Sequence, residues 1–154
     1  MDTQTNAQNT KTIKEQLRAN LLYSAYWLSD LTTEFLKHYD ITQQQFNVLT
    51  ILGEQHPEPI STKQIRERMI ISNSDTSRLI DRLCDKGLAW KRPCPHDGRL
   101  IQAFIHEKGQ ALLSEIGQNM AKLDDVMCNI TEAEATVVNK LLNKMRFHSK
   151  EKMV

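Results

Sequence analysis

The sequence contains little of what marks secreted or membrane proteins. Its three cysteines, Cys84, Cys94 and Cys128, are an odd number without close spacing, which argues against a disulfide framework and favours a reducing compartment. No run of apolar residues approaches the roughly 20 that span a bilayer, and residues 1–10 are polar. We therefore expect a cytoplasmic protein in which residues 1–10 form a disordered tail.

Motifs for catalysis and metal binding are also missing. The sequence has no glycine-rich phosphate loop, no nucleophile elbow and no pair of carboxylates in a plausible cleft. Its five histidines are scattered, and none forms an i, i+4 pair or a Cys/His spacing typical of zinc. We expect no enzyme activity, no cofactor and no metal site.

The charged residues are unevenly distributed along the chain. The net charge over 154 residues is only +1, and this length suffices for one domain with a hydrophobic core. Residues 61–108 nevertheless contain ten Lys or Arg against six Asp or Glu, whereas the remainder contains ten against thirteen. This asymmetry indicates a nucleic-acid-binding face in the middle of the chain.

Several helices are predicted before and within this basic segment. From about Thr12, apolar residues recur at spacings of three and four, which is typical of a long amphipathic helix. Two capping boxes, at 42–45 and 61–64, predict helices over 43–54 and 62–68.

The next helix has recognisable signals at both ends and is predicted over 73–86. Ser72 is a suitable N-cap because its hydroxyl can accept a hydrogen bond from the first turn. At the other end, Lys86 is the expected C-cap and Gly87 the C′ residue. Leu88 then occupies the position that makes the apolar contact of a Schellman motif.

Two extended segments, 88–93 and 100–106, flank a turn at 94–99 that contains Pro, Asp and Gly. Helical periodicity resumes over 107–129, and a third capping box at Thr131 begins a last helix. A helix-turn-helix followed by a hairpin is a winged helix. The predicted fold is therefore mainly α with a small β-hairpin wing.

The long helices at both ends of the chain carry more apolar surface than the small winged core can cover. The simplest way to bury that surface is against a second copy of the chain. We therefore expect a homodimer.

This arrangement resembles the MarR family of bacterial transcription regulators (multiple antibiotic resistance regulators) over roughly residues 17–145. The resemblance is carried by residues 42–49, 72–83 and 86–88, and by Asp97-Gly98-Arg99 with Ile105 and Gly109 after it.

The resemblance implies a single MarR-type winged-helix domain over 11–148. Helices at 11–38 and 107–148 would form a dimerisation module, and 42–106 would be the winged DNA-binding core. It further implies a homodimer that binds a pseudo-palindromic double-stranded operator, and an effector-responsive regulator, with repression as the expected mode.

The predicted DNA-binding residues lie on three elements of this core. The hydroxyls and the guanidinium at the front of the recognition helix suit phosphates and base edges, although Thr76 could equally belong to the core. Arg99 would enter the minor groove, braced by a carboxylate–guanidinium pair with Asp97. Basic residues beside these would contact phosphates or simply be surface charges. The full set is Lys63, Gln64, Asn73, Ser74, Thr76, Ser77, Arg78, Arg82, Lys91, Arg92, Asp97 and Arg99.

Two regulatory features are open at this stage. Tyr23, Tyr26 and Trp27 lie on the first helix, near the junction where the family binds small effectors, but three helical aromatics can also be plain core. Cys94 follows Lys91 and Arg92 and could be a redox-sensing thiol. The alternatives to a DNA-binding regulator are thus a winged-helix protein-interaction module and a thiol sensor acting through Cys94.

Overall fold

The computed structural model describes residues 12–70 and 75–150, with side chains up to residue 146. The tail expected at 1–10 lies outside the described residues. Two compact units are present, Met1–Ser114 and Glu115–Val154. Of the helices in the described ranges, none is long and apolar enough to cross a membrane.

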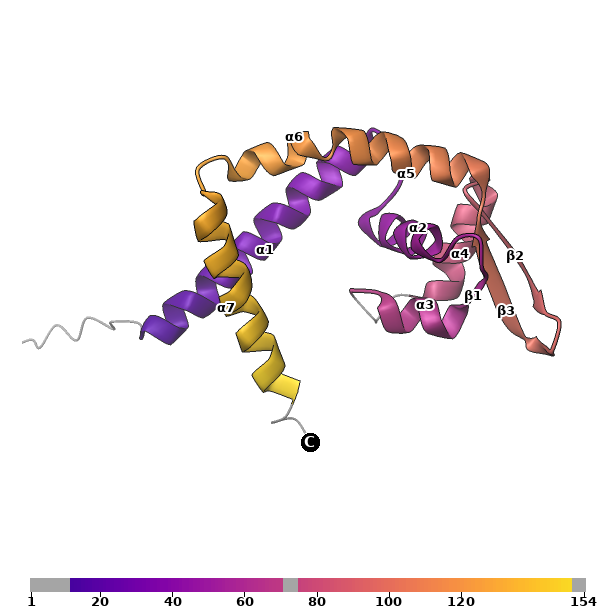
Figure 1. The fold of residues 1–154 in the computed structure, drawn as a ribbon, viewed down its shortest axis with the longest axis horizontal. Coiled ribbons are helices and arrows are strands. Elements are labelled where there is room, and N and C mark those ends of the chain that lie inside the picture. The colour runs from indigo at the N-terminus through magenta and orange to yellow at the C-terminus, as the bar shows by residue number, and fades with distance from the viewer. Residues whose placement is uncertain (1–11, 71–74, 151–154) are drawn as a thin grey trace, which may run out of the picture. The chain divides into compact units, whose positions relative to one another are not determined.

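The first unit begins with the long helix α1 (Ile13–Lys37), as the periodicity predicts. The hydroxyl of Thr12 accepts a hydrogen bond from the backbone N–H of Glu15, and the Glu15 carboxylate accepts one from the Thr12 N–H. This reciprocal pair satisfies two N–H groups that lack partners within the helix. In Figure 1, α1 extends away from the winged core.

Both predicted capping boxes of the core are confirmed. Helix α2 (Gln43–Gln55) begins at the N-cap Thr42, and α3 (Thr62–Arg68) begins at the N-cap Ser61. The sequence did not reveal the short strand β1 (Ile60–Ser61) that precedes α3. Two residues carry no detectable alternation, so only pairing with a distant strand defines this element.

The recognition helix α4 (Thr76–Asp85) begins later than predicted. Its N-cap is Asp75, whose carboxylate accepts a hydrogen bond from the Arg78 N–H at 3.3 Å; the expectation of Ser72 as N-cap was wrong. Asp and Ser are comparable N-caps, so the sequence alone could not separate them. Ser72 itself, with the expected first turn over 73–74, lies outside the described residues.

The end of α4 is confirmed as a Schellman motif. Gly87 has φ +68°, its N–H bonds to the Cys84 carbonyl at 2.9 Å, and the Leu88 N–H bonds to the Leu83 carbonyl at 2.9 Å. Gly adopts this left-handed conformation without the steric cost that a Cβ imposes.

The wing is a hairpin of β2 (Ala89–Cys94) and β3 (Asp97–Ile105). Its turn is tighter than predicted because Cys94 pairs with Asp97, so Arg99 lies in strand β3 rather than in the turn. With β1 the hairpin forms an antiparallel sheet of order β1-β3-β2. Figure 1 shows the closed end of the hairpin projecting beyond α3 and α4.

The core of this unit lies between the three short helices and the inner face of the sheet. Its fully buried side chains include Leu49, Leu52, Ile65, Ile80 and Leu83. Burial of this kind contributes about 1.5–3 kcal/mol for each large aliphatic side chain. The predicted class, mainly α with a small β wing, is confirmed.

The segment predicted as one helix over 107–129 is interrupted. Helix α5 ends at Asn119 (Glu107–Asn119) and is followed by α6 (Ala121–Asp124) and the 3-10 turn η1 (Asp125–Met127). The Asn119 side chain bonds back to the Glu115 carbonyl at 3.0 Å. Asn and the nearby Gly117 are weak helix formers, which explains the early end. The last helix, α7 (Glu132–Lys150), starts at the predicted capping box.

Candidate nucleic-acid interface

A hollow of about 400 Å³ lies where α3, α4 and β3 meet. Three cationic side chains line it: Lys63 and Arg66 from α3 and Arg99 from β3. Among the described residues none of these three forms an ion pair. Ser61, Thr62 and Ser77 line the same hollow, as does the acidic Asp75. The Ser61 hydroxyl already donates to Gln64, so the hollow offers an anion mainly the charge of its three cations.

The N-terminal part of α4 carries both buried and exposed side chains. Thr76 is buried, and its hydroxyl contacts the Met69 sulfur at 3.7 Å. Thr76 also lines the hollow, so its contact with DNA stays a prediction. Ser77 lines the hollow, while Arg78 and Arg82 are exposed. Asn73 and Ser74 lie outside the described residues.

Two of the exposed polar residues near the hollow already have local partners. The Arg78 guanidinium forms an ion pair with Asp75 at 3.4 Å. The Gln64 side-chain oxygen accepts hydrogen bonds from both the N–H and the hydroxyl of Ser61, at 3.0 Å and 2.8 Å. Both pairs are surface-exposed, and exposed pairs of this kind are weak, so they leave the cationic character of the face intact.

Lys91 and Arg92 point to opposite faces of the hairpin. Lys91 forms an ion pair with Asp81 of α4, and that hydrogen bond raises the pKa of Lys91. This contact ties the wing to the recognition helix. Lys91 is thus a link between elements, which the sequence could not show.

Arg92 lies on the outer face of the hairpin, over an aromatic pair. Trp90 and Phe104 stack with ring centroids 3.9 Å apart, and the Arg92 guanidinium lies 5.0 Å from the Phe104 centroid. Its Nε also donates to Gln102 at 3.3 Å. The planar guanidinium is suited to such stacking.

Asp97 braces the wing through the backbone. Its carboxylate accepts a hydrogen bond from the Arg99 N–H at 3.0 Å, in place of the carboxylate–guanidinium pair that we expected. The reason is local: with both residues in β3, the carboxylate reaches the N–H two residues on, as in an Asx turn. The Arg99 side chain instead lines the hollow.

Arg66 is the cation that the sequence analysis missed. Arg66 and Arg68 look alike in the sequence, but Arg68 is turned toward α2, where it pairs with Glu54 at 2.7 Å and Gln55 at 3.2 Å. The usable signal was spacing, because Lys63 and Arg66 are three residues apart and share one face of α3.

The remaining candidates are less well placed for chemistry. Burial raises the pKa of the Cys84 thiol, which lowers its reactivity because the thiolate is the nucleophile. Cys94 is half-buried at the hairpin end. Tyr23 and Tyr26 are 76% and 70% exposed, so they line no enclosed site within one chain. In the described part of the chain, no group of three His, Cys, Asp or Glu is placed to hold a metal.

These features define the class of protein: a winged helix-turn-helix whose recognition helix and wing flank one cationic hollow. Comparisons with known proteins agree. A model of the MarR family matches residues 39–100. The regulator MhqR of Bacillus subtilis is 23% identical over 125 residues, covering 80% of this chain and 85% of that protein.

Two solved structures have the same fold. A mutant of E. coli MarR in complex with operator DNA has a TM-score of 0.75 and 24% identity, covering 84% of this chain and 93% of that one. Bordetella bronchiseptica BpsR, whose DNA binding is regulated by 6-hydroxynicotinic acid, has a TM-score of 0.75 and 22% identity, covering 86% and 99%. The chain is thus similar in sequence to MarR-family helix-turn-helix transcription regulators, and it shares the fold of these two structures.

Proposed function

We propose that this protein is a homodimeric, sequence-specific DNA-binding regulator that represses transcription and responds to a small effector. The observation that carries the proposal is the hollow lined by Lys63, Arg66 and Arg99 between the recognition helix and the wing. Duplex DNA presents a phosphate strand between its two grooves, and cations that neutralise phosphates supply most of the non-specific affinity.

In this proposal α4 enters the major groove. Ser77, Arg78 and Arg82 face base edges or flanking phosphates, together with Asn73 and Ser74 before the helix. An arginine such as Arg78 can bond two acceptors of guanine at once. Its ion pair with the exposed Asp75 is weak enough to exchange for such contacts.

Arg99 reaches the adjoining minor groove, where a narrow A·T-rich tract concentrates negative potential. The phosphate strand between the grooves then lies against Lys63 and Arg66. Gln64, Lys91, Arg92 and Asp97 have supporting roles, because each is held by a partner within the core or wing.

Dimerisation is supported by apolar side chains that one chain leaves exposed. Helix α1 exposes Leu17, Leu22 and Trp27, and α7 exposes Val137 and Leu141. Large apolar side chains exposed in such number mark interaction surfaces. We propose that 11–38 and 107–148 form the dimerisation module of a single domain and 42–106 the winged core, with half-sites about 10 bp apart.

An effector would act by changing the separation of the two recognition helices, which a rigid operator tolerates only within limits. Regulation of BpsR by 6-hydroxynicotinic acid supports an aromatic effector. Tyr23, Tyr26 and Trp27 would line its site once a second surface covers α1. No observation favours the protein-interaction module or the Cys94 sensor over this proposal.

The test is DNA binding by the purified full chain. We expect selection from a random duplex pool to return a pseudo-palindrome, with affinity falling steeply as salt rises. Arg99→Ala should weaken binding and reduce the preference for A·T in the wing-contacted positions, while Arg68→Ala, which removes a cation paired with Glu54, should bind nearly as the parent does. A monomeric chain, or one that binds no duplex at low ionic strength, would contradict the proposal.

A further inference from the structure

Lys86, the C-cap of α4, has contacts that its capping role does not explain. Its Nζ donates to the Asp40 carboxylate at 2.6 Å and also to the Asp40 carbonyl oxygen. These contacts join the end of the recognition helix to the turn between α1 and α2, 46 residues earlier. Lys86 is half-buried whereas the Asp40 side chain is exposed.

Asp40 is held in an uncommon conformation at this point. Its φ is +53°, the only positive value for a non-glycine residue in the described chain. Asp and Asn tolerate this region better than other residues, but it is sparsely populated, and such positions cluster where the structure has a functional demand. The conformation presents both the carbonyl and the carboxylate of Asp40 to one ammonium group.

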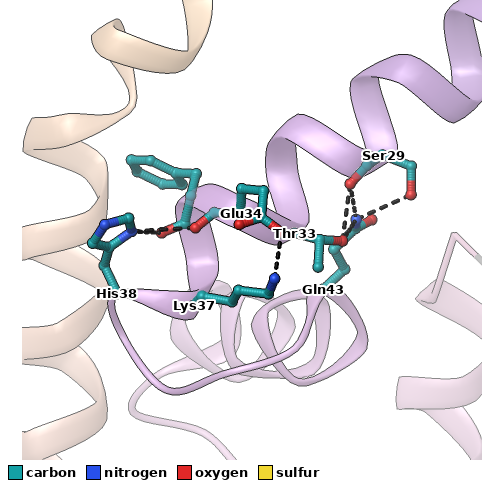
Figure 2. A network of polar contacts seen from close by, with 7 residues as sticks. Ser29, Thr33, Glu34, Lys37, His38 and Gln43 are labelled. Atoms are coloured by element: carbon teal, nitrogen blue, oxygen red, sulfur yellow. Dashed lines mark hydrogen bonds and ion pairs between the residues drawn. The ribbon is translucent and has the colours of Figure 1, made fainter.

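The turn that carries Asp40 is fixed to α1. Figure 2 shows Gln43, at the start of α2, reaching back to that helix. Its Nε2 donates to the Ser29 carbonyl and, at 2.7 Å, to the Thr33 hydroxyl. The segment that carries Asp40 is therefore attached to α1 on one side by the chain itself and on the other by the side chain of Gln43.

The helix that follows the wing contacts the same residue. Lys108, in the first turn of α5, donates its Nζ to the Lys86 carbonyl at 3.1 Å. Close by, the carbonyl of Leu88 accepts the His106 N–H at 3.0 Å. The C-terminal end of α4 thus contacts the turn that follows α1, through Asp40, and the first turn of α5, through Lys108.

We propose that Lys86 is a positioning residue that sets the direction of the recognition helix relative to α1 and α5. In this way it would set the spacing between DNA half-sites that the dimer accepts. The ten residues of α4 extend about 15 Å from Lys86 to the DNA-facing end. A tilt of about 10° at Lys86 would displace that end by roughly 2–3 Å over this length. The inference rests on the proposed function, because spacing has meaning only for a DNA-bound dimer.

The experiment compares spacing preference between the parent and two variants, Asp40→Asn and Lys86→Met. Asn keeps the left-handed conformation and removes only the charge. Binding is measured by fluorescence anisotropy on the selected operator and on operators with one base pair added or removed between half-sites. For both variants we expect the ratio of affinities for the selected operator and for the altered operators to fall by about threefold to tenfold, which is within the range of measured coupling effects.

Matched controls show whether the effect depends on where the ion pair lies or only on the loss of a charge. Glu34→Gln and Lys37→Met each break an ion pair that lies wholly within α1, three residues apart, and should keep the parental discrimination. Lys86→Arg can still reach the Asp40 carboxylate and should restore it. Unfolding curves of all variants should stay close to that of the parent, because the Asp40 side of this pair is exposed and such pairs add little stability.

Two results would overturn the inference alone: a dimeric parent with a clear spacing preference that both variants retain, or an equal loss of affinity on every spacing, which is what a merely structural role predicts. If the parent itself is monomeric or binds no duplex, the proposed function fails and this inference fails with it. The parent measurement therefore tells the two failures apart.

Discussion

A Cβ placed on Gly109 would lie 2.2 Å from the carbonyl oxygen of Leu88. The first turn of α5 thus packs directly on the residue that completes the Schellman end of α4, and no side chain fits between them. The same oxygen accepts the His106 N–H at 3.0 Å. This close approach explains why a helix tolerates glycine here despite its cost in helix propensity.

Gly109→Ala should therefore destabilise the protein by about 1–3 kcal/mol or more, because the atom in the way is backbone and cannot move aside. Urea unfolding measures the effect. Gly117→Ala in the same helix is the control, since a Cβ there meets no described atom within 4 Å; it should stabilise by up to about 1 kcal/mol. Equal stability of the two variants would show that the contact is looser than described.

Gly87→Ala tests the helix stop without a packing change. A Cβ at Gly87 meets nothing within 4 Å, but the φ of +68° penalises any side chain. We expect a loss of about 1–2 kcal/mol in the free energy of unfolding, and a smaller loss for Gly87→Asn, because Asn enters this region more readily. The idea fails if the Asn variant is the less stable of the two.

Arg66→Ala and Arg68→Ala form a matched pair on one short helix. Arg66 lines the hollow, whereas Arg68 pairs with Glu54 at 2.7 Å. Removing a phosphate contact should lower the slope of log affinity against log salt by about 0.9, and should do so equally on specific and random duplexes. We expect this for Arg66→Ala only. Identical slopes for the two variants would contradict the assignment of Arg66 as a phosphate contact.

The capping box of α7 should depend on pH in a defined direction. Hydrogen bonds from the N–H and the hydroxyl of Thr131 lower the pKa of Glu134. A carboxyl whose pKa is lowered by folding stabilises the folded state above its ordinary pKa, roughly 4.3, and this contribution is lost as the pH falls through the lowered value.

NMR titration of the full chain checks this prediction. The Glu134 carboxyl should titrate below the usual glutamate range, and Thr131→Ala should bring its pKa part of the way back, because one donor is removed and the backbone donor stays. Glu134→Gln should keep the cap and abolish this pH dependence. A normal pKa for Glu134 in the parent would contradict the cap geometry.

The fold was predictable wherever a feature depends on neighbours in the chain. The capping boxes at Thr42, Ser61 and Thr131 and the stop at Gly87 were all found, because each depends on hydrogen bonds spanning three to five residues. The start of α4 was not, since two suitable N-caps lie three residues apart.

The candidate site was predictable only in outline. The sequence located the basic segment and Arg99, but it left Lys91 open between a phosphate contact and a surface charge, and it overlooked Arg66. In the structure Lys91 is bound to Asp81, and Arg66 lines the hollow. Both facts depend on residues brought together from different elements.

By itself, then, the sequence determined the order of helices and strands, the places where most of them begin and end, and the resemblance to a known family. Those properties follow from short-range hydrogen bonding and from the periodicity of apolar residues, which are written along the chain. Tertiary structure alone decided which cations are paired and which line the hollow, because charges act through space. Arg66 and Arg68 lie two positions apart on α3 and face different surroundings, and only the packing of the other elements determines what those surroundings are.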